Sequence, residues 1–190
     1  MTVVDPTARD LLPRAAAAFS SRVRAVPASA WDNPTPCDGW TVRHLVGHLV
    51  EEHLWVPPLL AGQSIEEVGD RFAGDVLGDD PGAAWETSAT GSMQAWQEVS
   101  LDRTVRLSYG PTPVLGYAEE MLLDLVVHGW DLARGAGLDE RGDADLVEHV
   151  LAYVTAHLEE FQQAGVFGPR VEVSSDGPQD RLLGALGRRP

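Results

Sequence analysis

The chain has 190 residues, with 29 acidic side chains against 14 basic ones and a net charge of -15. This length and a hydrophobic content of 44% suit one globular domain with a sizeable core. The basic residues do not cluster, so we expect no nucleic-acid partner and no anionic membrane surface as a partner. Every basic residue is an arginine, which excludes chemistry that requires a lysine, such as a Schiff base or a P-loop.

The sequence contains a single cysteine, Cys37, which excludes an internal disulfide and a zinc site built on several thiolates. No stretch of eighteen uncharged apolar residues occurs, and the sequence therefore predicts no membrane span. The first residues, MTVVDPTARDLL, lack the basic start and apolar core of a signal peptide. We therefore expect a mature, cytoplasmic protein.

Five segments have helical periodicity and are separated by stretches rich in Gly, Pro and Asp. The predicted helices cover about 6–26, 41–56, 81–101, 114–134 and 143–163. We expect Pro57 and Pro58 to end the second helix, Gly135 or Gly137 to end the fourth, and Gly165 to end the fifth.

The regions between these helices predict shorter elements. Residues 57–82 contain several glycines and predict a loop with a short helical piece, residues 103–113 a short extended segment, and residues 167–190 an extended stretch followed by a short C-terminal helix. The fold class is therefore all-α: a single domain over residues 1–190, built as an antiparallel four-helix bundle with long crossover connections.

The predicted helix at 114–134 is apolar almost all round, which is typical of a buried helix. Its ionisable residues Asp124, His128 and Asp131 nevertheless fall within one sector about 60° wide at 100° per residue. Buried ionisable groups need a charged, hydrogen-bonding or metal partner, because leaving them unsatisfied costs several kcal/mol.

A metal site is one way to satisfy this cluster. Asp124 and His128 stand at i and i+4, which lets two side chains of one helix reach the same ion. A third ligand is His48, if the second and fourth long helices face each other. Two imidazoles and one carboxylate leave open positions, as in catalytic zinc sites. A set made of His44, His48 and Glu52 is weaker, because successive turns spread these side chains over about 11 Å.

A second interpretation is that Asp124, His128 and Asp131 form the solvated strip of an exposed helix, and that His44 and His48 do the same on the second helix. Spacing alone leaves both interpretations open. In either case Asp131 can pair with Arg134 at the helix surface or support a ligand histidine.

Cys37 precedes a predicted helix N-terminus, where it is either a reactive thiol or a small buried hydrophobe. Trp40 and Trp130 follow glycines and either line a pocket or anchor the core. The remaining histidines are interpreted as ordinary boundary positions: His53, His149 and His157.

Four stretches carry a resemblance to a known family: TPCDGWTVRHLVGHL, LLDLVVHGWDLARGAG, FGPRVEV and DRLLGALGR. Together they resemble the actinobacterial relatives of mycothiol-dependent maleylpyruvate isomerase, within the wider DinB-like group of metal-binding four-helix bundles. The resemblance spans nearly the whole chain. It implies a divalent metal, usually zinc, and carries the metal ligands over to His48, Asp124 and His128. Asp124 is an aspartate where the isomerase pattern has glutamate, so the carboxylate arm is one methylene shorter.

The resemblance also implies a function. In the isomerase, a thiolate adds to an unsaturated diacid, permits rotation about the former double bond, and leaves. We therefore expect a zinc-type protein that acts as a thiol-dependent isomerase or S-transferase, with mycothiol as a cofactor and a small thiol or electrophile as partner. The alternative is a non-catalytic, metal-stabilised bundle that acts in binding, homodimerisation or stress response. An open coordination position favours the first, and a fourth protein ligand such as His44 or Glu52 the second.

Overall fold

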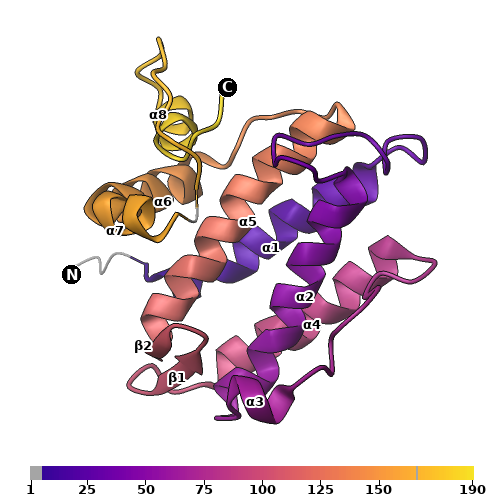
Figure 1. Cartoon of the computed structure of the whole chain (residues 1–190), viewed down its shortest axis with the longest axis vertical. Helices are drawn as coiled ribbons and strands as arrows, with labels where there is room; N and C mark the ends of the chain where they lie inside the picture. Colours follow the sequence, from indigo (N-terminus) through magenta and orange to yellow (C-terminus); the bar gives the residue numbers. More distant parts are fainter. Residues whose placement is uncertain (1–5, 166) are drawn as a thin grey trace. The chain divides into compact units, whose positions relative to one another are not determined.

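The computed structural model describes residues 6–165 and 167–190 and is mainly helical. Figure 1 shows the course of the chain. The elements in order are α1 (Ala8–Ala25), α2 (Val42–Leu60), α3 (Ile65–Val68), α4 (Pro81–Glu98), β1 (Thr104–Leu107), β2 (Gly110–Pro113), α5 (Val114–Ala136), α6 (Ala144–Ala156), α7 (Leu158–Ala164) and α8 (Pro178–Ala185).

The chain divides into two compact units, one comprising the described residues up to Asp139 and the other beginning at Glu140. In the first unit α2 packs against α4 and α1 against α5, while contacts between α2 and α5 and between α1 and α4 complete a four-helix bundle. The predicted all-α bundle with long connections is confirmed. A single domain over residues 1–190 stays a prediction.

The core of the first unit is formed by large side chains from all four long helices. Phe19 of α1 lies against Trp85 of α4, with ring centroids 4.6 Å apart, and Trp96 of α4 lies 5.3 Å from Tyr117 of α5. Burying a large apolar side chain contributes about 1.5–3 kcal/mol. The first contact joins α1 to α4, and the second joins α4 to α5, the helix with the polar cluster, most of whose side chains are buried.

Helix α2 begins as predicted and ends later than predicted. The Thr41 hydroxyl accepts a hydrogen bond from the backbone N–H of His44 at 3.3 Å, which caps the first turn. The helix continues through Pro57 and Pro58 to Leu60, so the expected end at these prolines was wrong. The fixed φ of proline is compatible with a helix, and the missing N–H groups remove only two ladder bonds near its end.

Helix α5 runs from Val114 to Ala136 and ends at Gly137, which has a φ of 69°. This left-handed conformation favours glycine and confirms one of the two predicted ends. Before α5, the predicted extended segment is an antiparallel hairpin in which Thr104 pairs with Pro113 and Leu107 with Gly110. The hairpin leads directly into α5 and fixes where that helix begins.

In the second unit, Leu182 and Leu183 of α8 are buried, and α8 packs against α6. The single helix predicted over 143–163 is interrupted at His157, which separates α6 from α7. His157 has a φ of -116° and ψ of 16°, outside the helical range, and the Tyr153 carbonyl accepts from its ring N–H at 2.9 Å. The predicted C-terminal helix is confirmed as α8.

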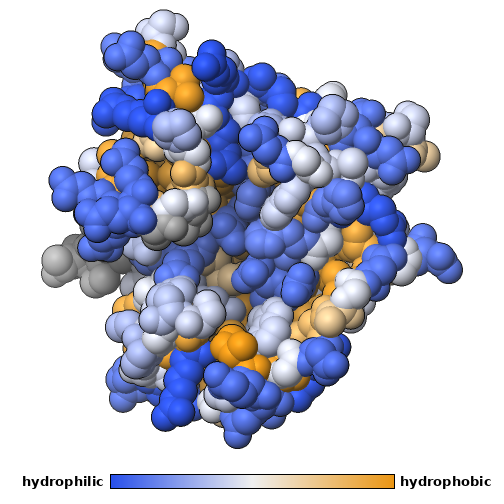
Figure 2. Space-filling view, viewed as in Figure 1, coloured by the Kyte–Doolittle hydropathy of each residue, from blue (hydrophilic) through white to orange (hydrophobic). Residues whose placement is uncertain are grey.

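Most of the surface in Figure 2 is hydrophilic, interrupted by small hydrophobic patches. The large apolar side chains exposed among the described residues are Tyr109 and Leu115. No helix within the described residues is both long and apolar enough to cross a membrane.

Candidate metal centre

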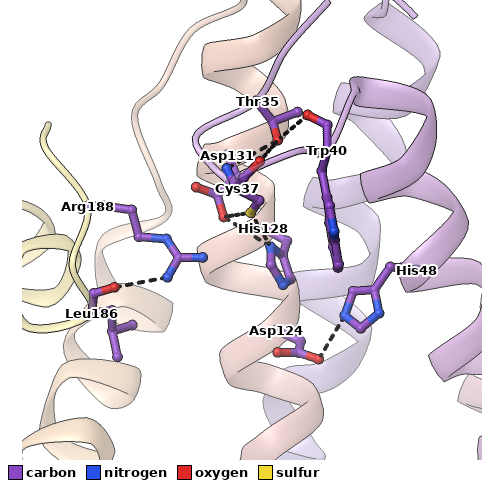
Figure 3. A network of polar contacts seen from close by, with 9 residues as sticks. All are labelled: Thr35, Cys37, Trp40, His48, Asp124, His128, Asp131, Leu186 and Arg188. Atoms are coloured by element: carbon purple, nitrogen blue, oxygen red, sulfur yellow. Dashed lines mark hydrogen bonds and ion pairs between the residues drawn. The ribbon is translucent and has the colours of Figure 1, made fainter. Parts of the chain in front are cut away.

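Helices α2 and α5 bring His48, Asp124 and His128 together. The Nε2 atom of His48 lies 3.7 Å from Oδ2 of Asp124, and one potential ligand atom from each of the three residues lies within 4.8 Å of the others. The imidazole rings of His48 and His128 are nearly perpendicular, with centroids 5.3 Å apart. Figure 3 shows the three side chains converging between the two helices. The expected meeting of α2 and α5 is therefore present, and metal binding by this group stays a prediction.

His128 is fixed in place by Asp131, one turn further along α5. The Nδ1 atom of His128 lies 3.0 Å from Oδ2 of Asp131, whose side chain is completely buried. A carboxylate accepts a hydrogen bond, so Nδ1 of the neutral ring carries the proton and Nε2 keeps the lone pair for a ligand. The exposed-strip interpretation was wrong for His128 and Asp131, which are 8% and 0% exposed, whereas Asp124 and His48 are partly exposed and His44 is exposed. Asp131 thus takes the predicted supporting position beside a candidate ligand.

The loop before α2 supplies the third side of the site. The backbone N–H and hydroxyl of Thr35 both donate to the Trp40 carbonyl, at 2.9 and 3.0 Å, and the Trp40 N–H donates to the Cys37 carbonyl at 3.0 Å. Gly39, with a φ of 76°, makes this turn possible. The loop thereby holds Cys37 and Trp40 against the end of α5.

Trp40 covers both imidazoles. Its ring centroid lies 5.0 Å from that of His48 and 6.0 Å from that of His128, on which it is stacked. Trp40 is itself half-buried. Of the two predicted roles for this residue, the structure favours that of a wall of the site, whereas Trp130 is buried, with the Arg134 guanidinium 4.7 Å from the centroid of its ring.

His44 and Glu52 do not join the group. The His44 ring instead accepts a hydrogen bond from the Thr41 backbone N–H at 3.4 Å, as part of the cap of α2. Glu52 lies one turn beyond His48, with its Oε1 atom 4.0 Å from Nδ1 of His48. Among the described residues, the three-residue group around His48 therefore has no fourth protein ligand from either residue.

The neighbourhood of the site is acidic. Burial raises the pKa of Glu52 to about 7, and the charge of Asp124 adds to this effect. Burial would also raise the pKa of Asp124, but the contact with His48 and the charge of His128 outweigh it, so the pKa lies below its ordinary value. For His48, the carboxylates of Asp124 and Glu52 outweigh burial and raise the pKa. Closely spaced carboxylates of this kind stabilise a bound cation.

A pocket of about 420 Å³ opens beside His48. Trp40, His44 and Gly47 line it on the side of α2, and the segment from Gly74 to Leu77 faces them. Arg43 spans the rim, where its guanidinium donates to Asp75 at 2.9 Å and to the Gly78 carbonyl at 2.8 Å. A small molecule in this pocket would contact the exposed side of His48.

Comparison with known proteins assigns the first unit to a protein family. The family model described as the mycothiol maleylpyruvate isomerase N-terminal domain matches residues 12–133. The chain belongs to this family. The match includes all three candidate ligands, Asp131, and the loop with Cys37 and Trp40.

Individual proteins are also similar to this chain. Uncharacterized proteins of Mycobacterium tuberculosis, from strains CDC 1551 and H37Rv, are each 30% identical over 146 residues, which is 75% of either chain. The crystal structure of a histidine-to-alanine mutant of the mycothiol-dependent maleylpyruvate isomerase matches 83% of this chain and 71% of its own, with a TM-score of 0.66 and 17% identity. A second crystal structure of that isomerase covers 76% of this chain and 66% of the isomerase chain, with a TM-score of 0.57 and 20% identity. These structures establish the shared fold.

Two features of this family member were not anticipated. Cys37 lies 3.4 Å from Oδ2 of Asp131 and 3.8 Å from Nδ1 of His128, although its position in the sequence indicated only a helix N-terminus. His53 is completely buried, so the boundary position expected for it was wrong. Its place one turn and a half after His48, on the apolar stripe of α2, is the signal that could have indicated burial.

Proposed function

We propose that the chain binds a divalent metal ion of the zinc type through His48, Asp124 and His128, and that this centre activates a small thiol for attack on an electrophile. The reaction class is isomerisation or S-transfer, with mycothiol as the thiol. The observation that carries the proposal is the convergence of two imidazoles and one carboxylate in a member of the maleylpyruvate isomerase domain family.

The three residues fit such an ion in distance and in chemistry. Zinc bonds of about 2.0–2.2 Å to nitrogen and oxygen place neighbouring ligand atoms about 3.4 Å apart in a tetrahedron. The separation of 3.7 Å between Nε2 of His48 and Oδ2 of Asp124 is close to this value. The ligand atoms of all three residues lie within 4.8 Å of one another, so small side-chain movements would bring them to the distances that an ion needs. Two imidazoles with one carboxylate match the ligand count of catalytic zinc sites, which keep a position for water or substrate.

The surroundings of the site favour a catalytic over a purely structural role. His44 is engaged in the cap of α2 and Glu52 lies outside the ligand group, so neither supplies a fourth ligand. The pocket lined by His48 and Trp40 gives a small molecule a place to bind next to one of the three candidate ligands. When bound, the metal would lower the pKa of a coordinated thiol toward neutrality and so supply a nucleophile.

The protein's own side chains then have distinct tasks. Asp131 accepts the Nδ1 proton of His128 and keeps Nε2 directed at the ion. Trp40 shields one face of both imidazoles from water, which strengthens electrostatic interactions at the site. The pocket formed by α2 and residues 74–77 holds the remainder of the thiol or its electrophile next to His48.

The chain's single cysteine allows a direct test of thiol binding. A Cys37→Ser protein loaded with cobalt(II) has no thiolate of its own, so a thiolate-to-cobalt charge-transfer band should appear only when mycothiol is added. The Cys37→Ser protein with His48→Ala in addition is the matched control and should show no band. Absence of the band in the first protein at saturating mycothiol would overturn thiol binding at the metal.

A further inference from the structure

A second group of metal-ligating side chains lies on the opposite edge of the His128 ring. It consists of Cys37 from the loop before α2, Asp131 from α5, and Nδ1 of His128. The Cys37 sulfur is 3.4 Å from Oδ2 of Asp131 and 3.8 Å from Nδ1 of His128, and the latter two atoms are 3.0 Å apart. Figure 3 shows the thiol, the carboxylate and the ring gathered at one point above His48 and Asp124.

These distances are close to those of a coordinated ion. Zinc bonds of about 2.3 Å to sulfur and about 2.0–2.2 Å to nitrogen or oxygen separate the ligand atoms by roughly 3.4–3.6 Å in a tetrahedron. Each of the three measured separations lies within a few tenths of an ångström of that range. An ion could therefore enter with small rotations of the side chains.

The group is also held in place before any ion arrives. Thr35 accepts from the Cys37 backbone N–H at 3.2 Å and donates to the Trp40 carbonyl, which fixes the loop. Asn33 ties the same loop to the end of α5 through a hydrogen bond from its side-chain amide to the Gly135 carbonyl at 3.2 Å. Pre-positioned ligands lower the ordering cost of binding an ion.

The donor atoms differ from those of the first site in one respect, the sulfur. A thiolate is a soft ligand that prefers thiophilic ions such as zinc and cadmium over magnesium or manganese. The first site has only nitrogen and oxygen donors, from His48, Asp124 and His128. The two groups should therefore rank metal ions differently.

We propose that Cys37, Asp131 and Nδ1 of His128 form a second cation site, selective for thiophilic divalent ions, which competes with the first site for His128. Binding at this group stands independently of the proposed function, whereas the competition rests on it. The second site gives excess zinc or cadmium a way to withdraw His128 from the first site.

The competition follows from the chemistry of imidazole. A neutral ring has one nitrogen with a lone pair and one with a proton. With a metal at Nε2, the proton is at Nδ1 and is accepted by Asp131. With a metal at Nδ1, coordination of the ion by Asp131 would replace the hydrogen bond between Asp131 and the ring. The ring proton would then be on Nε2, and the thiol proton of Cys37 would be released to solvent. One ion per chain is therefore the expected limit.

Cobalt(II) titration separates the two sites. The His48→Ala protein should bind one cobalt ion per chain with a thiolate-to-cobalt charge-transfer band in the near ultraviolet, because the Cys37 group is intact. The matched control carries His48→Ala together with Cys37→Ser and should lose the band. Circular dichroism should show that both variants keep the helical content of the wild type.

The outcomes bear on the proposal in distinct ways. A folded His48→Ala protein without the band, or a band that persists after Cys37→Ser is added, would overturn the second site. Two cobalt ions per wild-type chain would overturn the competition. The Cys37→Ser protein tests the first site separately: it should retain cobalt without a band, and loss of cobalt from this folded variant would overturn the first site. Failure of the proposed function is thereby distinguishable from failure of this inference.

Discussion

Two buried histidines of the same helical bundle, His128 and His53, are held in opposite ways. His128 has Asp131 on one ring nitrogen and faces His48 and Asp124 with the other edge of its ring. His53 is 0% exposed, and neither of its ring nitrogens has a hydrogen-bond partner among the described residues. It packs edge-on against Trp85, with ring centroids 4.9 Å apart.

The difference shows how burial can serve either packing or ligand binding. A buried imidazole with a fixed proton presents a directed lone pair, which is what a metal ion requires. A buried imidazole without partners is kept neutral instead, and burial lowers the pKa of His53 to about 4. His128 is therefore suited to binding, whereas His53 acts as a planar packing group with an energetic cost.

The largest effect should come from removing the ring of His128. His128→Ala removes a direct ligand from both proposed sites, and metal retention should fall to background, beyond the roughly 10–100-fold loss typical of a supporting residue. Elemental analysis of protein purified without a histidine tag measures this. His149→Ala, in the second unit, is the control and should retain metal like the wild type. Equal metal content in the two variants would contradict the ligand assignment.

The unpartnered histidine should instead make folding stability depend on pH. The ordinary pKa of 6.5 applies in the unfolded chain and about 4 in the folded one. As pH falls from 6.5 to 4, the unfolded state binds the proton first, so this group lowers the free energy of unfolding by roughly 3 kcal/mol over that window and has no effect above it.

His53→Leu removes the titrating ring while keeping an apolar side chain of similar size. The loss of stability between pH 6.5 and 4 should be smaller in the variant by the amount assigned to His53. Urea unfolding of both proteins at several pH values measures the difference. Parallel pH profiles for wild type and variant would refute the account of His53 as a neutral buried ring.

Asp131→Asn tests what distinguishes His128 from His53. The amide keeps the size of the side chain but lacks the charge that favours the Nδ1–H form of His128. Zinc affinity should fall about 10–100-fold. Competition with a chromophoric chelator gives the affinity, and urea unfolding of the metal-free protein separates a binding effect from a folding defect. Unchanged affinity in the folded variant would show that Asp131 does not orient the ligand.

The smallest effect concerns the support for the loop that carries Cys37. A Cβ at Gly135 would lie 3.0 Å from Val42 Cγ2 and 3.1 Å from the Pro34 carbonyl oxygen. Alanine is favoured over glycine in a helix by about 1 kcal/mol, but the clash with backbone costs about 1–3 kcal/mol. Gly135→Ala should therefore lower the free energy of unfolding by about 1 kcal/mol. Gly91→Ala, where a Cβ meets nothing within 4 Å, should be neutral or stabilising.

Much of the candidate site could be predicted because it follows from helical geometry. Asp124, His128 and Asp131 share one face of α5 by their spacing alone, and an apolar helix that carries them must be buried. His48 could be named as their partner because it lies at the border of the apolar stripe of α2, where a packed neighbouring helix can reach it. The all-round apolar character of the helix predicted at 114–134 also indicated that it is buried, as most of α5 is.

Other features depended on contacts between distant segments. Nothing in the spacing of Cys37 places its sulfur beside Asp131, because the loop conformation depends on hydrogen bonds from Thr35 and on contact with the end of α5. The burial of His53 involves Trp85 of α4, which is distant in the sequence, and α2 packs against the same helix.

Local rules thus account for the helices, their caps and the polar face of α5, since these depend on residues a few positions apart. Which edge of the His128 ring meets a proton acceptor and which meets His48 depends on how α2, α5 and the intervening loop pack. That choice sets the position of the lone pair, because a neutral imidazole offers only one.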